Sequence, residues 1–170
     1  NFDLSNFNTS KATRMDFMFS GCKSLTSLDV SDFDTSNVTD MGSMFSDCRG
    51  LTSLDVSNFN TENVTNMNSM FQYCFGLTSL DLSSFNTSNV TNMNSMFYYS
   101  LNLKSIRLGP NFDKLNGSNM FNICGDLTSI SVSANNENYK DIDGNLYSKD
   151  GTTLIQYAIG KTATSFTIPD

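Results

Sequence analysis

Apolar positions recur along this chain at one fixed interval. The interval that separates Phe33 from Phe59 also separates Phe59 from Phe85, and segments 25–50 and 51–76 keep apolar residues in the same columns while their polar positions vary. Such a pattern is typical of repeats that bury a core only by stacking on their neighbours. The sequence therefore predicts a solenoid.

Each repeat changes its apolar period part-way along. Leu51, Leu54 and Val56 follow the spacing L-x-x-L-x-L of a leucine-rich repeat, which predicts a short strand. After Phe59 the apolar residues take the spacing of one helix face, at Val64, Met67, Met70, Phe71 and Cys74. We therefore expect an α/β fold, a leucine-rich-repeat solenoid with a parallel β-sheet on one face and helices on the other. The expected strands are 2–4, 25–30, 51–56, 77–82, 103–108, 127–132 and 163–168.

The C-terminal part departs from this regularity. Residues 1–126 are tandem repeats, whereas 127–170 form a variant repeat, continuous with the same solenoid, that contains an insertion. In the insertion the pairs Asp143-Gly144 and Asp150-Gly151 flank short alternating runs, which predicts a β-hairpin. Its acidic residues do not have the spacing of an EF-hand loop, and no metal or cofactor is predicted.

Composition narrows the function classes. The chain has 10 Lys and Arg against 17 Asp and Glu, a formal charge of −7, and no His. Nucleic-acid binding is disfavoured, because phosphate contacts need clustered basic residues. No apolar run is long enough for a membrane span. Because both ends fall inside a repeat, we expect the chain to be a segment of a longer protein.

Cysteines recur with the same period. Cys22, Cys48 and Cys74 occupy one position in three successive repeats, Cys124 takes the equivalent place in the fifth unit, and Ser100 interrupts the series. We expect a buried column of free thiols at the helix ends, since stacked Cβ vectors point the same way. A disulfide between the first two is the alternative, because stacked coils lie about 5 Å apart. The Met-x-x-Met-Phe groups are interpreted as core packing.

Charged residues form a column on the predicted sheet face. Asp3, Asp29, Asp55 and Asp81 share one outward position, and Arg107 takes the next. Carboxylates this close repel one another, so the column needs local hydrogen bonds or a bound cation. Backbone amides are candidates for these bonds, as are the serine hydroxyls two residues before each carboxylate, those of Ser27, Ser53 and Ser79. A weak calcium or cationic-ligand site is the alternative.

Aromatic residues replace polar ones at one place in two neighbouring repeats. The first two units are polar around the cysteine, whereas the third and fourth carry Tyr73, Phe75, Tyr98, Tyr99 and Leu101. Stacking brings these five together, and such apolar patches often mark partner sites. We interpret them as binding residues. The alternative is that the hairpin at 136–157, or a second copy of the chain, covers this edge.

One motif connects the repeats to a known family. Phe-[Asp/Asn]-Thr-[Ser/Glu]-Asn-Val-Thr-[Asp/Asn]-Met-x-Ser-Met-Phe, followed by Cys or Ser and then by Leu-Thr-Ser-Leu-Asp, resembles the repeat of BspA-type bacterial leucine-rich-repeat surface proteins over residues 1–126. The tail resembles the other repeat subtype of that family, with its hairpin. The resemblance implies a secreted or wall-anchored protein that acts in adhesion. It carries over no catalytic residue.

The sequence supports one function and keeps two alternatives. We predict a non-catalytic, extracellular adhesion module on the bacterial cell surface that binds a host matrix protein, a neighbouring cell or a surface glycan, with self-association as a further option. A structural spacer that displays other modules shares every feature. A glycan-active enzyme built on Asp29, Asp55 and Asp81 is the remote alternative, because an open face has no pocket to desolvate an acid.

Overall fold

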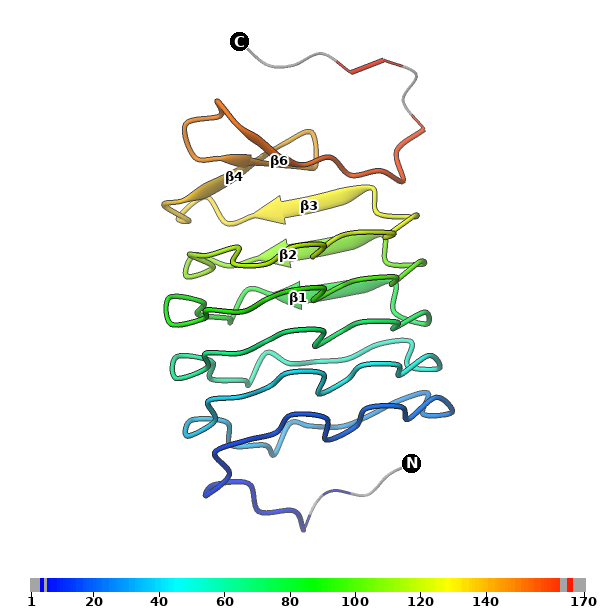
Figure 1. Cartoon of the computed structure of the whole chain (residues 1–170), viewed down its shortest axis with the longest axis vertical. Coiled ribbons are helices and arrows are strands. Elements are labelled where there is room, and N and C mark those ends of the chain that lie inside the picture. The colour runs from blue at the N-terminus through cyan, green and yellow to red at the C-terminus, as the bar shows by residue number, and fades with distance from the viewer. Residues whose placement is uncertain (1–3, 5, 163–164, 167–170) are drawn as a thin grey trace.

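The chain winds into a stack of coils that share one continuous core. A computed structural model describes residues 4, 6–162 and 165–166. Figure 1 shows the coils lying almost parallel, one above another, from the N-terminal to the C-terminal end. We number them coil 1 (to residue 24), coil 2 (25–50), coil 3 (51–76), coil 4 (77–102), coil 5 (103–126) and coil 6 (127–162).

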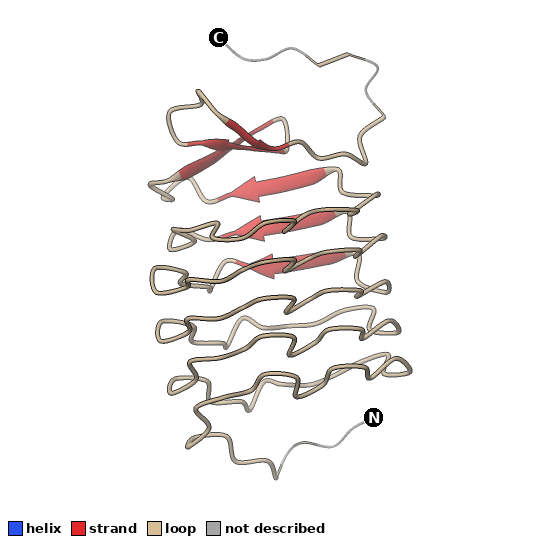
Figure 2. Ribbon diagram, in the orientation of Figure 1, coloured by secondary structure: helices blue, strands red, loops and turns tan. Residues whose placement is uncertain are grey.

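Three parallel strands form one face of the stack. β1 (Ser79–Leu82), β2 (Ser105–Leu108) and β3 (Ser129–Val132) pair in that order, in register from coil to coil. Side chains alternate between core and solvent, as the period of two requires. The equivalent segments 25–30 and 51–56 run along the same face but are not strands (Figure 2). Most of segments 2–4 and 163–168 lies outside the described residues.

The expectation of helices on the second face is wrong. No described residue is helical (Figure 2), so none belongs to a helix long and apolar enough to cross a membrane. Instead, alternate backbone N–H groups of one coil donate to carbonyls of the next at 2.8–3.0 Å, as from Ser43 to Asn68 and from Phe45 to Met70. The N–H groups between them bond within their own coil, as from Ser46 to Ser43. Both faces are therefore held by ladders that run from coil to coil.

Coil spacing explains why helices are excluded here. Neighbouring strands lie about 4.8 Å apart, whereas packed helices need about 8–10 Å. A second face that repeats at the strand spacing must therefore be thin. The chain achieves this with successive turns that place two residues in each of coils 1 to 5 at positive φ; the first of the two includes Ser43 (55°), Ser69 (53°) and Ser95 (57°). Short polar residues are common in turn conformations of this kind.

Methionine and phenylalanine side chains fill the space between the two faces. Phe19, Phe45, Phe71, Phe97 and Phe121 stack in one column, with ring centroids 5.3–6.0 Å apart. The methionines beside them in coils 2 to 4 are fully buried. The interpretation of the Met-x-x-Met-Phe groups as core is confirmed.

The predicted hairpin is confirmed and lies at the C-terminal end of the stack (Figure 1). β4 (Tyr139–Ile142) and β5 (Asn145–Ser148) are antiparallel, and β6 (Leu154–Gln156) adds to β5. Asp143 and Gly144 both have positive φ, 50° and 70°, as a two-residue type I′ turn requires. The hairpin contacts β3 and sits above coils 3 and 4, at a distance along the stack axis.

Candidate functional site

An aromatic cluster lies on one edge of coils 3 and 4, where the chain turns from the second face back toward the strands. Tyr73 lies at its centre, with ring centroids 6.1 Å from Phe75, 5.8 Å from Tyr98 and 5.5 Å from Tyr99. Phe75 and Tyr98 each also contact Tyr99, at 6.3 and 5.6 Å. All four rings, and Leu101 beside them in sequence, are half-buried. The hairpin, at the C-terminal end of the stack, does not cover them.

Two of these tyrosines occupy an unusual backbone position. Tyr73 and Tyr99 have φ of 58° and 63°, in the left-handed region. The same column holds Gly21 and Asp47 in coils 1 and 2, also at positive φ. Glycine and aspartate are the residue types expected there, whereas a bulky side chain at positive φ is uncommon. Coils 3 and 4 therefore carry tyrosine where the backbone favours smaller residues.

A charged group borders the cluster on the side of coil 2. The Arg49 guanidinium lies over the Phe75 ring, 5.3 Å from its centroid, and its Nε is 2.5 Å from an Asp47 carboxylate oxygen. Lys23 Nζ lies 3.3 Å from the other oxygen. Hydrogen bonds from Arg49 and Lys23 lower the pKa of Asp47. Sequence reasoning did not find this contact, although Arg49 and Phe75 are one repeat apart and hence in one column.

The column predicted on the sheet face is present and exposed. Ser31, Ser57 and Ser83, two residues after each carboxylate, donate their backbone N–H groups to Asp29, Asp55 and Asp81 at 2.8–3.0 Å. Hydrogen bonds from the hydroxyl and N–H of Ser31 lower the pKa of Asp29, and those of Ser57 lower that of Asp55. The partners of Asp55 and Asp81 are thus not the earlier serines that we expected. Arg107 pairs with Asp81 at 3.6 Å, and Asp3 lies outside the described residues.

The sheet column and the aromatic cluster are two separate surfaces. No hydrogen bond, ion pair or ring contact within the described chain joins the nine predicted site residues into one group. Local hydrogen bonds account for the carboxylates, and the described residues contain no group of three or more acidic, cysteine or histidine side chains placed to bind a metal ion. The aromatic cluster is the stronger candidate, because its residues contact one another.

The cysteines form a structural column. Cys48, Cys74 and Cys124 are buried, Cys22 is half-buried, and all four are free, so the disulfide alternative is wrong. The three buried thiols each donate to a phenylalanine carbonyl of the preceding coil at 3.1 Å, and the Ser100 hydroxyl makes the same bond at 2.8 Å. Burial raises the pKa of Cys48 to about 12 and that of Cys124 to about 11. Thiols protonated at neutral pH are poor nucleophiles.

Stacked coils with a parallel sheet on one face define the chain as a leucine-rich-repeat protein, and solved structures agree. A leucine-rich repeat protein from Eubacterium ventriosum aligns with 92% of this chain at 27% identity and a TM-score of 0.60. A leucine rich cell surface protein from Faecalibacterium prausnitzii aligns with 93% at 24% identity and a TM-score of 0.50, a likeness of fold alone. The chain spans 39% and 46% of the lengths of these two proteins.

The family is identified by a match over most of the chain. A family described as "Mycoplasma protein of unknown function, DUF285" matches residues 1–108 and 29–137. No curated protein matches the chain. The chain belongs to the DUF285 family, and its resemblance to BspA-type bacterial leucine-rich-repeat proteins is confirmed.

Proposed function

We propose that this chain is a non-catalytic protein-binding module of a bacterial cell-surface protein, and that the aromatic cluster is its contact surface. The observation that carries the proposal is the group of four mutually contacting rings, Tyr73, Phe75, Tyr98 and Tyr99, on an edge that is polar in coil 2. Tyrosine is enriched at protein interfaces because it offers a large apolar ring with one polar end.

Backbone conformation supports a role in binding rather than in folding. A non-glycine residue in the left-handed region costs on the order of 1–3 kcal/mol, and such strain clusters at functional sites. Asp47 shows that the fold accepts a short polar residue at the position of Tyr73 and Tyr99. Tyrosine at both places therefore has a backbone cost that the fold does not require, and a contact with a partner would offset it.

Arg49 and Leu101 extend the contact surface at its two ends. Arginine, like tyrosine, is prominent among residues that dominate binding energy at interfaces. Arg49 is already oriented, because Asp47 and the Phe75 ring hold its guanidinium. Leu101 adds apolar area in coil 4. The surface so defined joins a cation, four aromatic rings and an aliphatic side chain along the stack axis.

Exposed charges on the sheet face form a second, weaker contact surface in this proposal. Asp29, Asp55 and Asp81 face solvent, with Arg107 at the end of their column. Charges of this kind change association rates and specificity more than affinity. Because the column is open to solvent and nothing desolvates it, we propose no catalysis there.

The partner class and location follow from the family resemblance. We propose that the module acts outside the cell, in adhesion, and that it binds a host matrix protein or the surface of a neighbouring cell. A surface glycan and a second copy of the chain are other partners that the same screen covers. A module that only spaces other domains has no need of an aromatic surface, so the spacer predicts no binding at all.

A triple variant tests the proposal. Tyr73→Asp, Phe75→Arg and Tyr99→Asp convert the cluster to the polar residues of coil 2, and aspartate suits the positive φ of both tyrosine positions. Binding to a panel of matrix proteins, surface glycans and the chain itself is measured by surface plasmon resonance for the wild-type chain, the triple variant and a control. The control is Thr39→Asp with Thr65→Arg and Thr91→Asp, at exposed positions at the start of the second face, away from the cluster.

The expected result separates three outcomes. Wild type and control bind one member of the panel, whereas the triple variant loses at least about tenfold in affinity, as expected when residues that dominate an interface are removed. Its melting temperature should stay within a few degrees of wild type. A large loss of stability would show that the cluster is internal packing. Equal binding by the triple variant, or no binding by any form, would refute the proposal.

A further inference from the structure

The ladder on the second face stops at coil 5. In coil 4 the N–H groups of Ser95, Phe97 and Tyr99 donate to carbonyls of coil 5 at 2.9–3.0 Å. The equivalent N–H groups in coil 5 belong to Asn119, Phe121 and Ile123, as the positive φ of Asn119 (58°) and Ile123 (60°) confirms. None of these three N–H groups finds an acceptor among the described residues. Three donors thus form an open edge.

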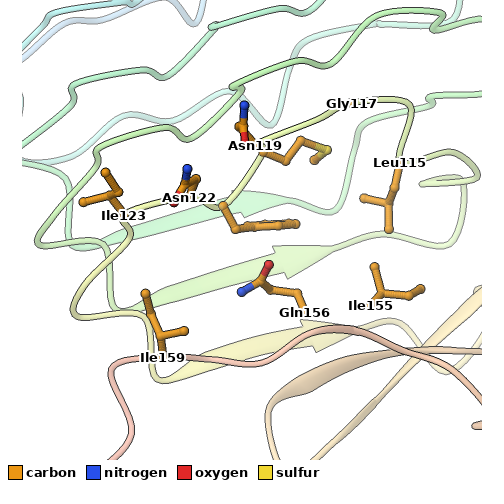
Figure 3. Close-up of a pocket in the computed structure, with 10 residues that line it drawn as sticks. Leu115, Gly117, Asn119, Asn122, Ile123, Ile155, Gln156 and Ile159 are labelled. Carbon is orange, nitrogen blue, oxygen red and sulfur yellow. The ribbon is translucent and has the colours of Figure 1, made fainter.

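A cleft lies beside this edge. Residues 117–123 form one wall and the segment after β5 forms the other, with Ile155, Gln156 and Ile159 opposite Asn119 and Ile123 (Figure 3). β6 pairs with β5 in the hairpin sheet, so this segment makes no ladder with coil 5. The volume between the two walls is about 430 Å³, within the range of ligand sites.

The cleft has an apolar lining that faces solvent. Ile123, Ile155 and Ile159 are 37%, 38% and 48% exposed, high values for isoleucine. Met120 and Phe121 line the cleft as well. These two are 4% and 6% exposed, close to their fully buried equivalents in coil 4, Met96 and Phe97, so the exposed apolar area of the cleft belongs to the isoleucines.

We propose that this cleft binds a segment of a partner protein, which takes the turn-rich conformation of the second face and adds to coil 5 as a further parallel rung of the ladder. The ladder between coils 4 and 5 shows which hydrogen-bond acceptors the bound segment must provide. Carbonyls of alternate residues accept from the open N–H groups, as those of Ser118, Met120 and Asn122 do above coil 4. Addition of a strand to an open sheet edge is a common mode of peptide recognition, in which the main chain gives affinity and side-chain pockets give specificity.

The occupant's side chains follow from the same geometry. Apolar side chains of the segment pack against the three isoleucines, while polar ones reach Gln156, Asn119 and Asn122 at the rim. The cleft shares no lining residue with the aromatic cluster of coils 3 and 4, although Ile123 follows Tyr99 in the same column. Its function therefore does not depend on that of the cluster, and the two are tested by different variants.

Nuclear magnetic resonance of the isotope-labelled chain tests the proposal directly. The probe is a capped synthetic peptide with the sequence of residues 116–123, the segment that takes the equivalent place above coil 4. Binding should move the amide resonances of Asn119, Phe121 and Ile123. It should also slow their hydrogen exchange about tenfold once free peptide reaches roughly nine times its Kd.

Two substitutions on neighbouring residues give a matched comparison. Ile155→Arg fills the cleft and should abolish binding, whereas Leu154→Arg, at a position 39% exposed and outside the cleft lining, should leave binding unchanged. Ile159→Arg repeats the test from the other end if the first variant unfolds. The triple variant of the aromatic cluster should bind this peptide normally.

The refuting results are equally specific. Unchanged resonances at saturating peptide would overturn the proposal. So would shifts confined to amides elsewhere, or equal effects of the substitutions at residues 154 and 155.

Discussion

Ser100 occupies the place of a cysteine in the column of Cys48, Cys74 and Cys124. Substitutions at Ser100 measure how much the hydrogen bonds of this column contribute to stability. The Ser100 hydroxyl donates to the Phe71 carbonyl at 2.8 Å and accepts from the Cys74 N–H at 3.3 Å, and the residue is 1% exposed. In coils 2, 3 and 5 a cysteine thiol makes the first of these bonds. We compare Ser100→Ala, which removes both bonds, with Ser100→Cys, which restores the residue of the other coils.

The expected change in the free energy of unfolding depends on the two backbone groups that lose their hydrogen-bond partner. Ser100→Ala leaves the Phe71 carbonyl and the Cys74 N–H without their partner, but these two groups can bond to each other, as Cys48 N–H and the Phe45 carbonyl do at 3.3 Å. The net loss is then one hydrogen bond, about 1 kcal/mol, and it rises toward about 3 kcal/mol if they stay unpaired. Ser100→Cys should change the free energy of unfolding by less than about 0.5 kcal/mol.

Urea unfolding followed by circular dichroism measures the difference. With an m value of about 2 kcal/mol/M, Ser100→Ala should lower the midpoint by about 0.5–1.5 M, while Ser100→Cys stays near wild type. An unchanged m value is needed, because local unfolding of one coil would change it. The reasoning is refuted if Ser100→Ala is as stable as wild type, or if Ser100→Cys is the less stable of the two.

Further predictions concern pH and calcium. Because burial raises the pKa of Cys48 to about 12 and of Cys124 to about 11, against about 8.5 for a free thiol, the folded state retains protons that the unfolded state loses. The free energy of unfolding should therefore fall as pH rises from about 8.5 toward 12, and the fall should be shallower in a Cys48→Ser variant; equal slopes would contradict it. Calcium at millimolar levels should leave the melting temperature unchanged, since Ser31, Ser57 and Ser83 already bond the carboxylates; a clear rise would instead indicate a metal site.

Periodicity alone predicted which side chains face the core. Phe45, Phe71 and Phe97 recur once in each repeat at the same position, and only stacked, equivalent positions satisfy that constraint for large apolar residues. The hairpin was predictable for a local reason, since Asp143-Gly144 is one of the few dipeptides that adopt positive φ at both positions. The contact of Arg49 with Phe75 was predictable in principle from their shared column.

Helices were wrongly predicted on the second face because a run of turns produces the same spacing of apolar residues as one face of a helix. Met67, Met70, Phe71 and Cys74 point inward from a run of turns, and each turn bond spans three residues, so the intervals of three and four arise without a helix. Periodicity reports the direction of side chains and not the backbone hydrogen bonds that produce it. The coil-to-coil spacing distinguishes the two, and it is a property of the stack that no single repeat contains.

One column of equivalent positions changes its residue type from coil to coil, unlike the columns that form the core. The position of Gly21 and Asp47 becomes Tyr73, Tyr99 and then Ile123, while its positive φ is kept throughout. The backbone thus remains constant while the side chain becomes larger and more apolar than the backbone favours. Core columns vary little because packing constrains them, so a column that changes against its backbone preference is where we place the proposed contacts. Both surfaces proposed for binding, the aromatic cluster and the cleft beside Ile123, lie along this one column.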